Sequence, residues 1–471
     1  MQVPTGSKVS QWTMTHFACA IVAFFVAQLL LLTGYSDPLA ALRAPATLIG
    51  VHLITIGWLS LLMLGALYQF VPVMCNTTLH SQRLALYALV AIVLGLLAML
   101  AGFSALGGNA ALSTDLLPIG GTLVVIGFVL VVVNLAATLW RVRPLPHPAI
   151  FVAFGLAFLV LTGLIGLGFG VFLGLPDPPG FLRALTGRGL SMHLAAGLGG
   201  WFTLTVMGVS YRLLTMFMLA PDELRRSTWA ALTLTAGGLA VLLVSGLIGV
   251  WTELATSPVV ALGAALAGIG VVFYLADIVH FYRTRKRREL ELNSITAGFA
   301  LAIFALALAL GALSWALGTL DRYGGAIGYL FVFGGLSGLG LSQLYKIIPF
   351  MTWLEVFGKR LGKGPVPRVQ DLVNERRARP GFALYFVATL LASAAIASEQ
   401  AVAWEIAASL QTLATVLIAI EFWRSRHPDP NLKPTLGRPP GMSAAAKLKA
   451  APGASAKLAA SPPMGTDRQG E

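Results

Sequence analysis

The stretch that decides the fold is residues 51–74, VHLITIGWLSLLMLGALYQFVPVM, which recurs twice in altered form. The later copies are MHLAAGLGGWFTLTVMGVSYRLLTMF at 192–217 and YGGAIGYLFVFGGLSGLGLSQLYKIIPFM at 323–351. Each stretch exceeds the ~20 apolar residues that a helix needs to cross a bilayer. The three stretches therefore predict three membrane-spanning helices of one kind, distributed along a longer chain.

The composition extends this prediction to all 471 residues, of which 57% are apolar and 11% are charged. Soluble domains carry ~25% charged residues, so a soluble enzyme and a disordered protein are both excluded. The ~10-residue alternating segments of outer-membrane barrels are absent. We predict an all-α integral membrane protein whose twelve spans lie near 12–34, 47–74, 83–104, 115–140, 148–174, 188–219, 228–252, 255–282, 293–318, 322–350, 380–398 and 400–423.

The three related stretches share a small residue that is followed three positions later by tyrosine. The pairs are Gly65 with Tyr68, Gly208 with Tyr211, and Ser342 with Tyr345. Because these pairs recur every four spans, we predict one transmembrane domain, 1–423, built from repeat units at about 12–140, 148–282 and 293–423.

Two further expectations follow from residue type. A small residue within the membrane lets another helix approach closely, whereas Pro72 and Pro349 should end their helices. Residues 424–471 are rich in proline, alanine and basic residues, and are predicted to form a disordered basic tail.

The formal charge of +13 is distributed unevenly along the chain. The basic residues on one predicted side are Arg43, Arg183, Arg188 and Arg322; Arg212 and Lys346 lie inside spans, and the others lie on the opposite side. The positive-inside rule therefore predicts cytoplasmic termini and a bacterial-type inner membrane. The basic excess reports topology and contact with the lipid bilayer, and we expect no nucleic-acid partner.

Two histidines stand out because both fall in the predicted outer half of the membrane. His52 lies near the start of span 2, and His193 near the start of span 6. An imidazole in hydrocarbon is costly without a partner, so each histidine is either a metal or heme ligand or a neutral ring bonded to a carbonyl. His147 is expected in a solvated loop. Asp277 and His280 are expected to share a helix face and pair.

The chain resembles subunit I of the heme–copper oxidases and nitric-oxide reductases, in which twelve helices form three arcs. His52, Gly65 and the VPVM at 71–74 resemble the helix-2 signature of that family, whose histidine is an axial ligand of a low-spin heme. Residues 345–351 resemble the end of its helix 10, and His193 falls on the helix that supplies a copper ligand. The resemblance implies heme or copper on His52 and His193, and a respiratory-chain or periplasmic electron-transfer partner.

The chain also departs from that family. Helix 10 of the active enzymes supplies two histidines, whereas span 10 here has none and carries Tyr329 and Ile327 at the positions that correspond to His52 and His193. Span 7 also lacks histidine. A complete oxygen-reducing centre is therefore not expected.

Three interpretations remain open. The first is a divergent relative, similar to the NnrS-type membrane proteins, that binds one heme or metal for electron transfer, gas sensing or metal handling. In it, Arg43, Arg188 and Arg322 would lie near the heme propionates. The second is a cofactor-free respiratory assembly or structural subunit that docks through the basic loop 359–379. The third is a small-solute secondary transporter.

Overall fold

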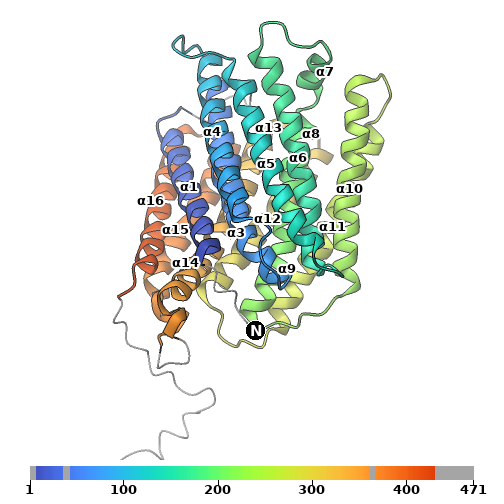
Figure 1. Cartoon of the computed structure of the whole chain (residues 1–471). Coiled ribbons are helices and arrows are strands. Elements are labelled where there is room, and N and C mark those ends of the chain that lie inside the picture. Colours follow the sequence, from blue (N-terminus) through green and yellow to red (C-terminus); the bar gives the residue numbers. More distant parts are fainter. Residues whose placement is uncertain (1–6, 36–42, 361–365, 430–471) are drawn as a thin grey trace, which may run out of the picture.

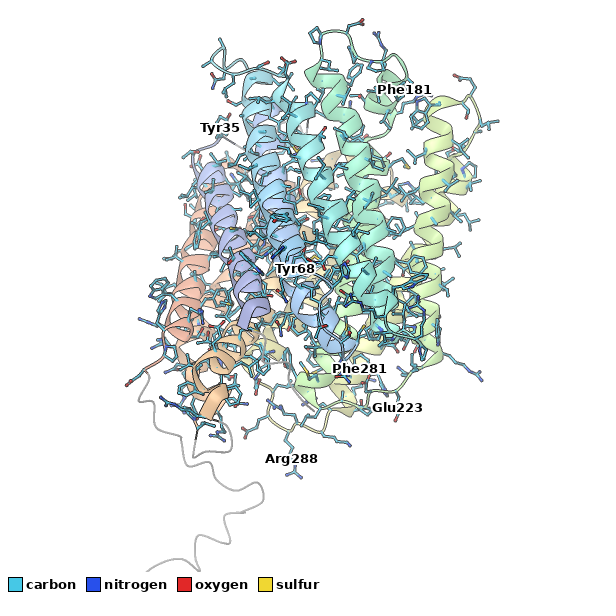
Figure 2. All side chains as sticks on the ribbon, viewed as in Figure 1. Tyr35, Tyr68, Phe181, Glu223, Phe281 and Arg288 are labelled. Carbon is cyan, nitrogen blue, oxygen red and sulfur yellow. The ribbon has the colours of Figure 1, made fainter. Side chains whose placement is uncertain are left out.

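The computed structural model describes residues 7–35, 43–360 and 366–429. Within them, twelve helices are long and apolar enough to cross a membrane, which confirms a multi-pass α-helical membrane protein. The axes of these helices are roughly aligned with one another (Figure 1). We call the end that carries Glu223 and Arg288 the basic end, and the end that carries Tyr35 and Phe181 the opposite end (Figure 2).

Most spans are single α-helices, which pack side by side as antiparallel neighbours. They are α1 (Ser7–Leu32), α4 (Gln82–Leu106), α5 (Leu116–Trp140), α6 (His147–Gly174), α10 (Arg226–Trp251), α11 (Ser257–Thr284), α12 (Leu292–Ala316), α15 (Glu375–Ala397) and α16 (Ala401–Arg426). The short helix α7 (Phe181–Arg188) covers the opposite end between α6 and α10.

The other three spans, numbers 2, 6 and 10, change from α-helix to π-helix and back. Span 2 is α2 (Pro45–His52), η1 (Leu53–Ser60) and α3 (Leu61–Met74). Span 6 is α8 (Leu190–Leu194), η2 (Ala195–Leu204) and α9 (Thr205–Met218). Span 10 is α13 (Leu320–Tyr329), η3 (Leu330–Ser337) and α14 (Gly338–Phe357). These are the spans that carry the shared sequence pattern.

Side-chain hydroxyls support the π-helical segments. Ser60 Oγ donates to the carbonyl of Thr55, and Thr203 Oγ1 donates to the carbonyl of Leu198, each over 2.7 Å. In both pairs the carbonyl lies five residues before the hydroxyl, the spacing of a π-helical turn. The hydroxyls therefore give the widened turns an additional hydrogen bond in a region without water.

Two indole hydrogen bonds join the three composite spans. Trp58 Nε1 donates to Ser337 Oγ over 2.9 Å, and Trp201 Nε1 donates to Ser60 Oγ over 3.1 Å. Both indoles are fully buried. Span 2 is therefore bonded to span 10 and span 6 is bonded to span 2, whereas span 10 has Gly335 where the other two have tryptophan.

The small residues of the sequence pattern allow the close helix contacts that were predicted. A Cβ added at Gly65 would lie 2.7 Å from His16 Cβ on α1, and one at Gly208 would lie 2.7 Å from Phe151 Cβ on α6. Real Cβ atoms do not approach so closely, so an alanine at either position would force the helices apart.

The two prolines do not end their helices, so that prediction is wrong. Pro72 lies inside α3, and Pro349 lies inside α14, which continues to Phe357. A membrane helix tolerates proline where the freed carbonyl finds other partners. Of the predicted basic loop and tail, residues 361–365 and 430–471 lie outside the described residues.

We expect each indole–hydroxyl bond to stabilise the fold by about as much as other hydrogen bonds between membrane helices. A double-mutant cycle with Trp58→Phe and Ser337→Ala should give a coupling energy of about 0.6 kcal/mol, and below about 2 kcal/mol. The free energy of unfolding would be measured in detergent by chemical denaturation. Trp140→Phe with Ser337→Ala is the matched control, because Trp140 is exposed; coupling in that control equal to the first would contradict a direct bond.

Candidate metal site and buried charges

His52 is the last residue of α2, immediately before the π-helical segment. Its Nδ1 bonds to the carbonyl oxygen of Leu48 over 2.7 Å. Because a carbonyl can only accept, Nδ1 carries the proton and the lone pair of Nε2 stays available. The ring packs against Phe103 of α4, with 5.0 Å between ring centroids. His52 thus has a fixed tautomer and one nitrogen that could bind a metal.

His193 lies on α8, at a similar point near the start of span 6. Its Nδ1 is buried and has no hydrogen-bond partner among the described residues. The ring meets Phe169 edge-on, with 5.5 Å between centroids, and packs on Gly166. A Cβ at Gly166 would lie 2.9 Å from His193 Cε1. The glycine therefore provides the space that this imidazole occupies.

The two predicted ligands, His52 and His193, lie near the starts of spans 2 and 6. The rings of His52 and His193 are close enough for an electrostatic interaction between them. Among residues 7–35, 43–360 and 366–429, no group of three or more His, Cys, Asp or Glu side chains could hold a metal ion. The candidate site therefore offers two imidazole nitrogens, and ligation by them stays a prediction.

The three outer arginines make different contacts. Arg43 Nη2 lies 3.5 Å from the carbonyl oxygen of Gly187, next to Arg188 at the end of α7. Arg322 instead covers the ring of its neighbour Tyr323, at 5.3 Å from the centroid. Arg43 and Arg188 are thus placed together at the opposite end, near the starts of spans 2 and 6.

The structure corrects the prediction for His147, which is 6% exposed and lies within the first turn of α6. Its ring packs edge-on against Trp229 and Phe151, at centroid distances of 4.5 and 5.3 Å. The helix starts at the histidine itself, so the side chain points into the bundle where a loop residue would face water. Neither ring nitrogen has a hydrogen-bond partner among the described residues.

Asp277 of α11 also differs from its prediction, because His280 is not among its partners. The carboxylate is fully buried and accepts four hydrogen bonds near the basic end. The donors are Arg225 Nη1 at 2.7 Å, Ser227 Oγ at 2.6 Å, Thr228 Oγ1 at 3.0 Å and Tyr211 Oη at 3.0 Å. These residues come from the start of α10 and from α9, so one carboxylate ties three helices together. Spacing along α11 alone could not indicate partners on other helices.

Replacing Asp277 should therefore be costly. We expect Asp277→Ala to lower the free energy of unfolding by at least about 2 kcal/mol, because the buried hydroxyls of Tyr211 and Thr228 lose their acceptor. Asp222→Ala removes an ion pair with Arg212 in which Asp222 is 69% exposed, and should cost about 0–1 kcal/mol. Chemical denaturation in detergent would compare the two variants, and equal losses would contradict this role for Asp277.

A second ionic cluster lies at the basic end, around Glu291. Glu291, immediately before α12, bonds to Lys346, Arg287 and Gln370. Burial alone would raise the pKa of Glu291, but the bonds from Lys346 and Gln370 and the nearby cations outweigh it and lower the pKa below the usual 4.5. Lys346 of α14 is thus paired with a largely buried carboxylate.

The lowered pKa predicts a specific pH dependence. In the folded state Glu291 stays charged at a pH where the same side chain would be protonated in the unfolded chain. Its contribution to the free energy of unfolding is therefore complete above about pH 4.5, and it disappears as the pH falls through the lower pKa of the folded state. We expect Glu291→Gln to lower the melting temperature at pH 7, and the difference from wild type to shrink below pH 4.5. Glu289→Gln, at an exposed position, controls for the charge change; a difference that grows in acid would contradict the prediction.

Comparison with known proteins adds no family to this geometry: no protein-family model matches the chain, and no curated protein has a significantly similar sequence.

Proposed function

We propose that this protein is a divergent relative of heme–copper oxidase subunit I that binds one metal centre through His52 and His193, for electron transfer, gas sensing or metal handling. The observation that carries the proposal is the state of His52. Its Nδ1–H is bonded to the Leu48 carbonyl, which orients the ring and leaves Nε2 as a ligand nitrogen. His193, near His52 and with an unpartnered buried nitrogen, supplies the second donor.

The kinship and the three-unit architecture are part of the same proposal. Spans 2, 6 and 10 each contain a π-helical segment, and each segment includes a glycine at the equivalent position. Gly57 packs on Ala23 of α1, Gly200 on Phe158 of α6, and Gly334 on Ile303 of α12. In each proposed unit, the second span thus packs its glycine against the first span of the same unit. A shared contact of this kind supports three related units of four helices.

The packing around the two histidines favours a metal ion over a heme. The imidazoles are in contact with Phe103 and Phe169, so a heme on either histidine would have to displace these rings. Two neutral imidazoles without a further His, Cys, Asp or Glu ligand suit copper, for which imidazole is a good donor. Bound copper would supply one-electron transfer. The protein would orient both nitrogens and keep water away from them.

The proposal is tested by metal content and spectra. Protein purified in detergent should contain about one copper per chain by mass spectrometry, and His52→Ala and His193→Ala should each lower occupancy at least tenfold. His280→Ala is the control, because that half-buried histidine lies near the other end of the bundle. A reduced-minus-oxidised spectrum with pyridine hemochrome detects the heme version of the site. A colourless, metal-free wild type would refute a metal centre of either kind.

A further inference from the structure

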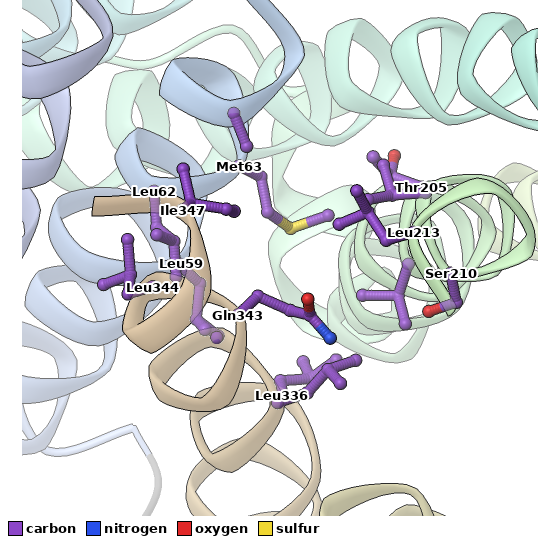
Figure 3. A pocket seen from close by; sticks show the side chains of 15 residues that line it. Leu59, Leu62, Met63, Thr205, Ser210, Leu213, Leu336, Gln343, Leu344 and Ile347 are labelled. Atoms are coloured by element: carbon purple, nitrogen blue, oxygen red, sulfur yellow. The ribbon is translucent and has the colours of Figure 1, made fainter. Parts of the chain in front are cut away.

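A cavity of about 70 Å³ lies between spans 2, 6 and 10. Its walls come from α3 and the end of η1, from α9, and from α14 and the end of η3 (Figure 3). These residues follow the indole bonds along the three spans, so the cavity lies toward the basic end of the bundle. It is separate from His52 and His193, neither of which lines it.

Gln343 projects into this cavity among apolar side chains (Figure 3). Its Oε1 is buried and has no hydrogen-bond partner among the described residues. The other polar residues of the lining are Ser210 and Thr205, and the Oγ1 of Thr205 is also without a hydrogen-bond partner among the described residues. Thr205 Oγ1 lies against Gly155 of α6, and Ser210 lies beside Tyr274. Gln343 therefore presents a polar group in a mostly apolar space.

The unpartnered amide is costly as it stands. A buried acceptor without a donor costs about 1–3 kcal/mol. Water is a poor solution, because a buried water needs two to four polar partners and apolar cavities stay dry. A guest that brings an apolar body and a single donor satisfies the Gln343 oxygen and fills the rest of the space.

We propose that the cavity between spans 2, 6 and 10 binds one small neutral molecule that has an apolar body and one hydroxyl, with Gln343 Oε1 as the acceptor. The size of the cavity sets the upper limit. A cavity of about 150 Å³ accommodates benzene, so about half that volume suits a molecule of the size of a short-chain alcohol. No cation lines the space, among the described residues, to attract an anion.

The test uses 2-fluoroethanol as the probe and ¹⁹F NMR as the readout, with full-length protein in detergent. Wild type should bind 2-fluoroethanol saturably, and Gln343→Leu should bind it about three- to tenfold more weakly, the value of one hydrogen bond. 1-Fluoropropane, similar in size but without the hydroxyl, should bind both proteins equally. Comparing the two probes separates the contribution of the hydrogen bond from that of filling the cavity.

Filling the cavity provides the second arm. Ala66→Leu extends into the space from α3 and should abolish binding of both probes, whereas Ala276→Leu, exposed on α11, should bind as wild type. Val209→Phe fills the same space from α9 and replaces Ala66→Leu if that variant elutes as an aggregate. Absence of saturable binding to wild type would overturn the proposal. So would unchanged binding in both the filled variant and Gln343→Leu, because the probe would then be held by detergent or by the surface.

Discussion

The arrangement of the bundle depends on how spans 2, 6 and 10 meet at its centre, where no water can satisfy a polar group. Two indole N–H groups are buried there, and each finds a serine hydroxyl on another of the three spans. An unsatisfied N–H in hydrocarbon would cost several kcal/mol, so these bonds fix the relative depth of the spans. The π-helical segments permit this, because the extra residue in each turn lets one segment pack Gly57 on α1 and direct the adjacent Trp58 toward span 10. Span 10 has Gly335 where the other two spans have tryptophan, so it contributes no indole bond. The cavity between the three spans lies beside the two indole bonds that are present.

At the basic end, buried carboxylates pair with some of the abundant cations. Asp277 and Glu421 are both nearly inaccessible, and each bonds to an arginine at or near the start of the preceding span. Asn134 of α5 occupies a comparable place without charge and bonds twice to the backbone of Ser81. In each of the three proposed units, the last span is thus joined to the start of the third by a polar side chain. A carboxylate with several donors is stabilised in such a setting, whereas a lone one would be expelled.

Much of the architecture could be predicted because hydrophobic runs of membrane length encode spans directly. The twelve spans fall where their apolar residues begin and end, and the small residues at 65 and 208 mark close contacts because nothing larger fits. The π-helical turns could not be predicted, since a local change of helical period leaves composition unchanged. The prediction for Pro72 is wrong for a related reason: a proline predicts a lost hydrogen bond, but the surrounding helices decide whether the helix continues. Asp277 and His147 show the same limit, because their partners lie on helices that are distant in sequence.

The candidate site was predictable in its residue types but not in its asymmetry. Both histidines follow from the cost of imidazole in hydrocarbon, yet only the structure distinguishes them. His52 is held by its own helix through Leu48, so its orientation survives whether or not a ligand is present. His193 interacts with the backbone of Thr162 on α6 and packs on Gly166 and the edge of Phe169, whereas its Nδ1 has no hydrogen-bond partner among the described residues. If both histidines bind a metal as proposed, His52 on span 2 would define where the metal sits, and His193 on span 6 would supply the second donor.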